Sequence, residues 1–463
     1  MAPKFGTSGL RGLVTELTEG LVRDYTGAFL AACPHGGAVH VGRDLRPSSP
    51  QIAEWVMQAI EGAGVQAIDC GVLPTPALAL SSLGAGQAAV MVTGSHIPAD
   101  RNGLKFYVPT GEISKTDEDA IGAHLGKGVT GIAAPARIAQ DAVADYTQRY
   151  TKAYGGALKG LRIGVYQHSS VARDVMVEVL GALGADPVAL ARSDSFIPVD
   201  TEALDPATRG MLAGWCNAHG LDAVISTDGD ADRPMVADAS GRIIPGDVLG
   251  ALTARSLGAK VLCTPVSSNT MVAQMPEFDQ VTLTRIGSPY VIAAMEAAVE
   301  ADPKAKVVGY EANGGFLLGF EGQGPAGSLA PLMTRDCLLP ILAPLAEACA
   351  QGVTLGALAD ALPPRFTAAD RIAGIETDVS KAFIAQMSDD AAARAAFFAD
   401  TGTETALDET DGLRVTFEGG DVVHLRPSGN APEFRCYAEA ASAERALGLV
   451  TQYLGKLRDE LAG

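Results

Sequence analysis

Three aspartates occupy alternate positions in the segment Asp228-Gly-Asp230-Ala-Asp232. A loop that curls can direct all three carboxylates onto one hard cation, and Mg²⁺ prefers such oxygen ligands together with phosphate oxygens. The same spacing begins a calcium-binding loop, but the glutamate that such a loop needs at its last ligand position is replaced by Ala239. A solvated acidic turn is the other alternative. The pattern therefore favours a magnesium site.

Ser95 has the sequence context of a phosphoryl carrier. It follows the apolar run 87–92, stands between Gly94 and His96, and has Lys105 shortly downstream. A serine at a strand end can be an exposed nucleophile or carry a phosphoryl group, and a nearby lysine can shift its proton or hold its phosphate. Many such serines only form hydrogen bonds within turns. No Gly-x-Ser-x-Gly elbow is present and no histidine is obviously paired with Ser95, so the sequence disfavours a serine hydrolase.

A donor-rich patch lies near the C-terminal end in the segment Arg426-Pro-Ser428-Gly429-Asn430, with Arg435 after it. Guanidinium groups bind phosphate through two parallel hydrogen bonds, and side-chain and backbone donors of a glycine turn can fill its remaining acceptors. A plain turn with solvated arginines is the alternative. The composition of the segment is typical of a phosphate-binding site.

Two further glycine-containing segments are candidates for ligand contact. The glycine-rich stretch 5–12 contains Arg11 and lets the backbone approach a ligand closely, but it lacks the Gly-Lys-Ser/Thr of a P-loop. The segment Glu311-Ala-Asn313-Gly-Gly315 offers one carboxylate and one amide, a suitable pair for sugar hydroxyls. A simple turn explains the second segment nearly as well.

The elements that must position these residues alternate between strand-like and helical runs over the first three quarters of the chain. Short apolar strands at 87–92, 222–226 and 306–309 each end in one of the polar loops. In parallel sheets, ligands bind at such strand ends. The last quarter differs, because a hairpin at 413–425 and a closing helix at 443–461 predict a smaller α+β domain.

The predicted fold class is α/β, with three similar mixed α/β domains of helix-covered sheets followed by the smaller α+β C-terminal domain. A chain of 463 residues is too long for one core, since domains usually contain about 100 to 200 residues. The predicted domains are 1–148 with Ser95, 149–247 with the three aspartates, 248–364 with Glu311, and 365–463 with Arg426. The pair Pro363-Pro364 is the most visible linker.

Charge and composition exclude several classes of protein. The chain has 35 Lys and Arg against 54 Asp and Glu, a formal net charge of −19, which disfavours binding to nucleic acid or to an anionic membrane. Its 7 cysteines are scattered, odd in number and never spaced as paired metal ligands, so reduced thiols in a cytoplasm are expected. No apolar run approaches the roughly 20 residues that span a bilayer, and the N-terminus has no apolar signal core.

Taken together, the motifs resemble the α-D-phosphohexomutase family, and within it the bacterial phosphomannomutases and phosphoglucomutases, over the whole chain and in the family's order. The resemblance implies catalytic roles for Ser95, Lys105, Arg11 and His96, and a Mg²⁺ ligand set of Ser95, Asp228, Asp230 and Asp232. The predicted substrate contacts are Arg233, Glu311, Asn313, Arg426, Ser428, Gly429, Asn430 and Arg435.

The resemblance also implies the reaction: a hexose 6-phosphate and a hexose 1-phosphate, with mannose the favoured sugar, interconvert through phosphorylated Ser95. Hexose 1,6-bisphosphate is then intermediate and activator, and the expected partner is a small phosphosugar, bound by a monomer or weak homodimer. The alternatives are a phosphoglucomutase, a phosphoglucosamine mutase, a metal-dependent phosphatase, or a non-catalytic sugar-phosphate-binding protein on the same fold.

Three positions depart from the family pattern. Ile97 stands where the family commonly has asparagine, Asn313 replaces the usual serine of the sugar loop, and Gly315 replaces a histidine seen in several subfamilies. The carrier serine and the metal ligands are intact, so these departures bear on the identity of the sugar and leave the type of reaction unchanged.

Overall fold

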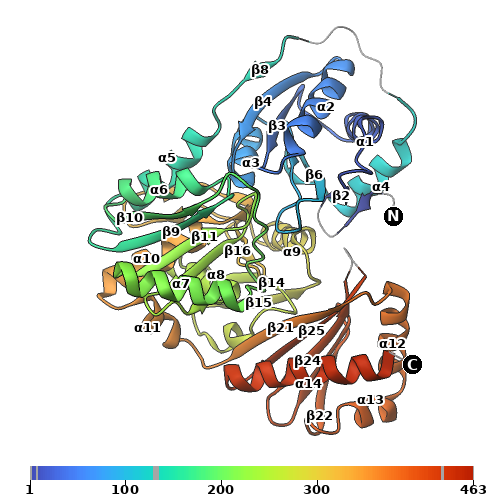
Figure 1. Ribbon diagram of the computed structural model, residues 1–463, viewed down its shortest axis with the longest axis vertical. Coiled ribbons are helices and arrows are strands. Elements are labelled where there is room, and N and C mark those ends of the chain that lie inside the picture. Colours follow the sequence, from blue (N-terminus) through green and yellow to red (C-terminus); the bar gives the residue numbers. More distant parts are fainter. Residues whose placement is uncertain (1–2, 7–8, 129–134, 429–431, 462–463) are drawn as a thin grey trace.

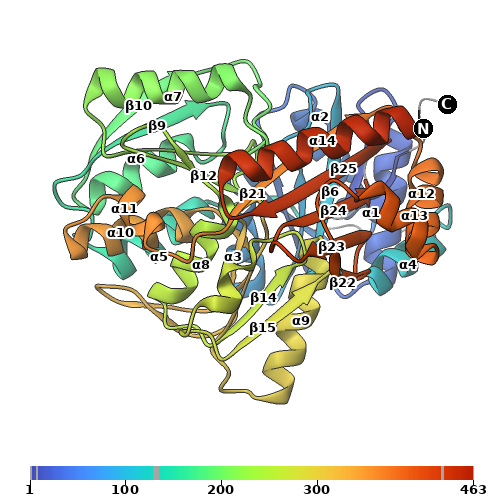
Figure 2. The ribbon, with the colours of Figure 1, turned by 90° about the horizontal axis from the view of Figure 1, so that it is seen from below.

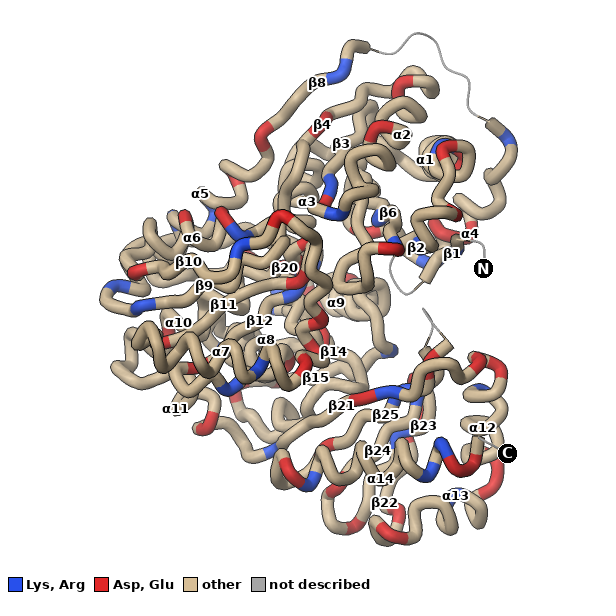
Figure 3. The backbone as a smooth tube through the Cα atoms, viewed as in Figure 1, with Lys and Arg blue, Asp and Glu red and all other residues tan. Residues whose placement is uncertain are grey.

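The computed structural model describes residues 3–6, 9–128, 135–428 and 432–461 (Figure 1). Three helix-covered sheets follow one another along the chain, and a fourth, C-terminal sheet lies at the opposite end of the molecule from the first (Figures 1 and 2). Acidic positions are distributed over all four parts (Figure 3). None of the helices in the described ranges combines the length and apolar character that crossing a bilayer requires.

The first sheet has the order β1-β2-β6-β5-β3-β4-β8, and β7 pairs with β6. Its strands are β1 Lys4–Phe5, β2 Leu10–Leu13, β3 Ala38–Arg43, β4 Gln66–Val72, β5 Ala88–Val92, β6 Arg101–Val108, β7 Gly111–Glu112 and β8 Ile138–Ala139. Its helices are α1 Glu19–Ala32, α2 Ser49–Gly62, α3 Thr75–Gly84 and α4 Lys115–His124. Helix α2 begins with a proline in its first turn, which suits the fixed φ of that residue, and buries one apolar face.

The second sheet has the order β10-β9-β11-β12-β13. Its strands are β9 Arg162–His168, β10 Asp186–Arg192, β11 Ala223–Thr227, β12 Pro234–Asp238 and β13 Ile243–Ile244. Its helices are α5 Val143–Tyr154, α6 Arg173–Ala182 and α7 Pro206–His219.

The third sheet has the order β15-β14-β16-β17-β20, beside a separate hairpin of β18 and β19. The strands of the sheet are β14 Val261–Pro265, β15 Gln280–Thr284, β16 Val307–Tyr310, β17 Phe316–Leu318 and β20 Leu332–Asp336, and those of the hairpin are β18 Gly322–Gln323 and β19 Ser328–Leu329. Its helices are α8 Gly246–Ser256, the 3-10 helix η1 Thr270–Gln274, α9 Ser288–Ala301, α10 Leu338–Gln351 and α11 Leu355–Asp360.

The three sheets share one arrangement of strands. In each, three parallel strands (β4-β3-β5, β10-β9-β11 and β15-β14-β16) are followed by an antiparallel neighbour, β6, β12 or β17. The loops before these neighbours are the serine loop (93–100), the aspartate loop (228–233) and the glutamate loop (311–315). Each is too short for a parallel crossover, which needs about a dozen residues. The sheets are therefore mixed, whereas the alternating sequence pattern alone is typical of purely parallel sheets.

The C-terminal sheet is antiparallel throughout, with the order β21-β25-β24-β23-β22. Its strands are β21 Phe366–Ala373, β22 Glu404–Asp408, β23 Leu413–Phe417, β24 Val422–Pro427 and β25 Glu433–Ala440, and its helices are α12 Thr377–Asp389, α13 Ala391–Phe397 and α14 Ala443–Leu461. The predicted hairpin and closing helix are both present. The predicted fold class is confirmed.

The apolar core divides unevenly between these parts. One large cluster of buried side chains runs from Ala38 to Leu362 and includes residues of all three helix-covered sheets. The C-terminal sheet packs its own cluster against α14, through side chains such as Leu449 and Tyr453. The C-terminal domain therefore has a separate core, whereas the first three share one large cluster and each has a smaller one besides. The proposed boundaries at 148, 247 and 364 stay predictions.

Candidate active site

The serine loop holds Ser95 in a strained conformation. Ser95 follows β5 and has a φ of 55°, in the left-handed region that non-glycine residues rarely adopt. Its backbone N–H donates to Thr93 Oγ1 over 2.8 Å. The side chain is buried, with the residue only 1% exposed, rather than exposed as the sequence context suggests. The reason is tertiary, because the loop is covered by groups from other parts of the chain.

Arg46, which the sequence analysis missed, holds the main chain of the serine loop in place through hydrogen bonds. Its guanidinium is fully buried and pairs through Nε with Asp44 Oδ2 at 3.1 Å. Its other nitrogens donate to four main-chain carbonyls, those of Ser95, Ile97, Pro98 and Arg101, over 2.8, 2.6, 2.7 and 3.1 Å. The ring of Phe196 lies 4.1 Å from the guanidinium carbon. The available sequence signal was a pair of charged residues directly after an apolar strand.

The aspartate loop is shaped by its contacts with the first domain. A Cβ on Gly229 would lie 2.9 Å from the carbonyl oxygen of Ser95, so only glycine permits this approach. Ala231 has a φ of 58°, which tightens the turn between β11 and β12. The carbonyl of Asp230 accepts a hydrogen bond from the backbone N–H of Thr75 over 2.9 Å. Contacts from the first domain and the turn of the second domain together hold the aspartate loop in place.

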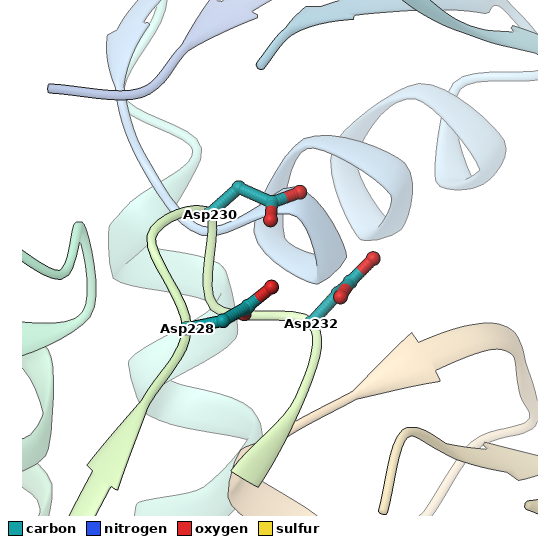
Figure 4. A group of neighbouring side chains, drawn as sticks. All are labelled: Asp228, Asp230 and Asp232. Atoms are coloured by element: carbon teal, nitrogen blue, oxygen red, sulfur yellow. The ribbon is translucent and has the colours of Figure 1, made fainter. Parts of the chain in front are cut away.

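The three aspartates project from this loop toward the same side (Figure 4). One oxygen from each carboxylate lies within 4.8 Å of the others, and all three residues are buried. Asp228 Oδ2 accepts a hydrogen bond from Ser95 Oγ over 2.6 Å. Lys105 Nζ lies 2.6 Å from Asp230 Oδ2 and 2.5 Å from Asp232 Oδ2. The structure therefore brings the predicted carrier, lysine and carboxylates into one cluster.

The cluster fits a divalent cation. Among the described residues, Oδ1 of Asp230 and Oδ1 of Asp232 are buried without a hydrogen-bond partner, although buried polar atoms are normally paired. Burial, together with the neighbouring carboxylates of Asp230 and Asp232, raises the pKa of Asp228 well above its ordinary value. A cation held by these hard oxygens would offset that repulsion, as Mg²⁺ does with carboxylate ligands.

The pKa of Asp232 moves in the opposite direction. Burial alone would raise it, but the positive charges of Arg335, Lys105 and Arg233 outweigh burial and lower the pKa of this carboxyl. Asp232 is therefore ionised at neutral pH, whereas Asp228 is more readily protonated than Asp232.

A cavity of about 660 Å³ opens beside this cluster and is lined by residues of all four domains. The predicted site residues in its lining are Arg11, His96, Arg233, Glu311, Asn313, Arg426, Ser428 and Arg435, and Arg335 joins them although the sequence analysis missed it. Gly429 and Asn430 lie outside the described residues. In the described part of the chain, Ser95, Lys105 and the three aspartates lie beside the cavity and are not part of its lining.

The charges around the cavity favour an anionic ligand. Burial, with Arg233 and Arg335 nearby, lowers the pKa of Arg11 to about 10, so its guanidinium still carries a charge at neutral pH. Burial and the positive charges of nearby arginines, of which Arg233 has the largest effect, lower the pKa of His96 well below its ordinary value. His96 is neutral at neutral pH, and its Nδ1 lies 3.2 Å from Ser95 Oγ.

The glutamate loop carries two polar side chains, those of Glu311 and Asn313, which have different hydrogen-bonding partners. Glu311 Oε2 lies 3.4 Å from Arg335 Nη1. Asn313 Oδ1 accepts a hydrogen bond from the backbone N–H of Gly315 over 3.0 Å, while Gly314 turns the chain with a φ of 86°. The amide oxygen of Asn313 therefore has a partner within its own loop, and its amide nitrogen is the group available as a donor to a ligand.

The C-terminal domain places two arginines side by side. Arg426 on β24 is the direct cross-strand partner of Arg435 on β25. Like charges at opposed positions destabilise a sheet, and an anion bound between them would offset the repulsion. Arg426 Nε also donates to Asp411 Oδ2 over 2.8 Å, and Ile286 N–H donates to the same oxygen over 2.9 Å. Asp411 was missed in the sequence because no motif surrounds it.

Four family descriptions match the chain in succession. They are those of the phosphoglucomutase/phosphomannomutase alpha/beta/alpha domains I, II and III, over residues 2–130, 144–241 and 245–366, and of the C-terminal domain, over 375–454. The chain belongs to the phosphoglucomutase/phosphomannomutase family. The predicted membership of the α-D-phosphohexomutases is confirmed, and the protein is a mutase, an intramolecular phosphotransferase.

Relatives match over nearly all of their length. The phosphomannomutase of Sinorhizobium fredii (strain NBRC 101917 / NGR234) is 45% identical, covering 100% of both chains, and that of Salmonella muenchen is 41% identical, covering 99% of this chain and 96% of its own. The phosphoglucosamine mutase of Thermobifida fusca (strain YX) is 30% identical, covering 100% and 99%. The crystal structure of a phosphoglucomutase/phosphomannomutase family protein from Burkholderia thailandensis shares the fold, with a TM-score of 0.77 at 20% identity, over 100% of this chain and 98% of that one.

Proposed function

We propose that this mutase is a Mg²⁺-dependent phosphomannomutase that interconverts mannose 6-phosphate and mannose 1-phosphate. Phosphorylated Ser95 is the carrier, and hexose 1,6-bisphosphate is both intermediate and activator. The observation that carries the proposal is the contact of Ser95 Oγ with Asp228 Oδ2 at 2.6 Å, inside a buried cluster that also contains Lys105. A serine at this place can share one cation with the carboxylates.

Asp228, Asp230 and Asp232 would hold the cation, which when bound neutralises charge on the transferring phosphoryl group. Lys105, in contact with Asp230 and Asp232, is placed to stabilise charge on the same group and to move a proton at Nζ. Arg11 and His96 line the cavity next to the serine loop and are further candidates for proton transfer. The chain supplies the positive charges of Lys105 and Arg11 within a buried site, where their effect is strongest.

The reaction then follows from two transfers. A free hydroxyl of the sugar phosphate attacks phosphorus on Ser95, the bond from phosphorus to Ser95 Oγ breaks, and the hydroxyl proton passes to a nearby base. The bisphosphorylated sugar turns round, Ser95 Oγ attacks the phosphorus of the other phosphate, the bond from that phosphorus to the sugar oxygen breaks, and the sugar oxygen takes back a proton from the same base. Arg426 and Arg435 would hold the distant phosphate in both orientations, as cross-strand partners on a domain with its own core.

The choice of mannose rests on the relatives, and the glutamate loop is compatible with it. The two relatives called phosphomannomutase share 45% and 41% of their residues with this chain, against 30% for the relative called phosphoglucosamine mutase. Glu311 can accept hydrogen bonds from adjacent sugar hydroxyls, and Asn313 can donate to one. Neither group needs to contact the hydroxyl at which mannose and glucose differ. We therefore expect only modest discrimination between these two sugars.

The decisive experiment compares the 1-phosphates of mannose, glucose and glucosamine at equal concentration, with hexose 1,6-bisphosphate present. Mannose 1-phosphate is expected to give the highest kcat/KM, with glucose 1-phosphate close behind. Release of free sugar and inorganic phosphate would indicate a phosphatase instead, and a strong preference for glucosamine 1-phosphate would overturn the assignment. A cytoplasmic location and a monomeric or weakly dimeric state stay predictions.

A further inference from the structure

Arg335 lies at the junction of two loops that come from different domains. It stands near the end of β20, and its side chain is 4% exposed. Its Nη2 lies 2.8 Å from Asp232 Oδ2 in the aspartate loop, and its Nη1 lies 3.4 Å from Glu311 Oε2 in the glutamate loop. One planar guanidinium therefore contacts a carboxylate of the aspartate cluster and the carboxylate of Glu311, which lines the cavity.

Gly315 makes room for this arginine. A Cβ at position 315 would lie 2.8 Å from Cγ and 2.9 Å from Cδ of Arg335, distances that real side chains essentially never show. Any side chain at 315 would push the stem of Arg335 and move its guanidinium. Position 315 is one of the departures noted above, where several subfamilies have histidine. The space beside the glutamate loop is thus filled by Arg335 from the neighbouring strand.

We propose that Arg335 is a positioning residue that fixes Glu311 toward the sugar and Asp232 toward the cation at the same time, and that Gly315 is required because it admits Arg335. The inference rests on the proposed function, since it assigns the sugar contact to Glu311. A guanidinium suits this role because its planar fork contacts two carboxylates in fixed geometry, whereas a lysine is a point charge.

The first consequence concerns substitutions of Arg335. Arg335→Ala should raise the KM for mannose 1-phosphate at least tenfold, because Glu311 loses its partner. It should also weaken Mn²⁺ binding at least threefold, because Asp232 loses the guanidinium that orients it and keeps only Lys105 and Arg233. Arg335→Lys should return either the KM for mannose 1-phosphate or the affinity for Mn²⁺ toward the wild-type value, but not both, because an ammonium group cannot contact both carboxylates in the same way. Isothermal titration of Mn²⁺ provides a reading that does not depend on turnover. Arg255→Met, which breaks the ion pair with Glu347 at 2.9 Å in the same domain, is the matched control and should change neither quantity.

The second consequence is a double-mutant cycle. Gly315→Ala should lower kcat/KM at least tenfold when Arg335 is present and less than threefold in the Arg335→Ala background, where Cγ and Cδ are gone and only the 3.1 Å contact with Cβ remains. Gly322→Ala, whose added Cβ would meet Leu257 at an ordinary 3.4 Å, is the control. If Arg335→Ala does not fold, the Mn²⁺ titration of Arg335→Lys tests the inference in place of the cycle, because lysine keeps Cγ and Cδ and cannot relieve the contact with position 315.

Full additivity in this cycle, or variants of Arg335 that bind both Mn²⁺ and mannose 1-phosphate as the wild type does, would overturn the inference. Failure of the proposed function gives a different result. The wild type would then lack mutase activity on mannose phosphates, while the Mn²⁺ titrations of Arg335→Ala and of the Arg255→Met control would still differ if Arg335 positions Asp232.

Discussion

The guanidinium of Arg46 donates a hydrogen bond to the main-chain carbonyl of Ser95 over 2.8 Å. Because Ser95 has a φ of 55°, its backbone needs external support to stay in place. Arg46→Lys keeps the positive charge beside Asp44 but cannot contact four carbonyls at once. We expect kcat to fall by about 100-fold, the cost of a small displacement of a reacting group, and stability to fall by about 1 to 3 kcal/mol.

The control for this prediction is Arg43→Lys, which alters a partly exposed ion pair with Asp69 at 3.5 Å in the same domain. It should cost less than about 1 kcal/mol and leave kcat unchanged. Denaturant unfolding and steady-state kinetics measure both effects. Equal behaviour of the two variants would mean that Arg46 does not support the serine loop.

Ser95 should carry a phosphoryl group in at least part of the purified protein, because the proposed cycle starts from that form. Intact-mass and peptide mass spectrometry can detect it. Ser95→Ala should lower turnover by several orders of magnitude, since the transfer loses its acceptor. A protein that is fully active without bisphosphate activator and never phosphorylated at Ser95 would refute the mechanism.

Removal of the metal or of one ligand should stop the reaction without unfolding the protein. Asp230→Ala should abolish most activity and weaken Mn²⁺ binding, because charge on the transferring phosphoryl group is then poorly compensated. Asp279→Ala, which removes a carboxylate that is 70% exposed and lies 3.9 Å from Lys260, is the control. If a chelator leaves turnover unchanged, the aspartate loop has a structural role only.

Loss of the Asp411 side chain should weaken the binding of mannose and glucose phosphates to a similar extent. Its Oδ2 accepts from Arg426 Nε and from the N–H of Ile286, so it orients the arginine and ties the C-terminal domain to the third domain. Asp411→Ala should raise the KM for mannose and glucose phosphates by a similar factor of about ten, as expected for a hydrogen bond with a charged group. Asp421→Ala, which removes the partner of Arg445 in the same domain, is the control. An effect on one sugar only would contradict this role.

His424 gives the C-terminal domain a predictable dependence on pH. Burial lowers the pKa of its ring from 6.5 to about 4, and its Nε2 lies 2.6 Å from the carbonyl of Asp411. Between these two pKa values the unfolded chain binds a proton that the folded chain does not, so stability falls as pH decreases through this window. The loss should be about 2 kcal/mol from about pH 7 to about pH 5.

Denaturant unfolding at several pH values measures this slope, and tryptophan-independent probes such as far-UV circular dichroism suffice. In His424→Phe the corresponding part of the slope should vanish, because no titrating ring remains. An unchanged slope in that variant would show that other groups control the acid sensitivity of the domain.

The sequence by itself determined the class of fold and the residues of the main motifs. Apolar periodicity and short-range spacing are local signals, so the strand before Ser95, the strand before Asp228 and the closing helix α14 could all be located without coordinates. The combination of parallel and antiparallel strand pairs in each sheet was harder to predict from the sequence. It depends on how the chain turns back through the serine, aspartate and glutamate loops.

Only the tertiary structure decided which charged residues support the site. Ser95 and Asp228 meet although 133 positions separate them, and that contact was anticipated only because both lie in recognisable motifs. Arg46 and Arg335 stand in no motif, and a solvated arginine looks the same in sequence as a buried one. Their roles arise from tertiary packing, which places Arg46 against the serine loop within the first domain and Arg335 between Asp232 of the second domain and Glu311 of the third.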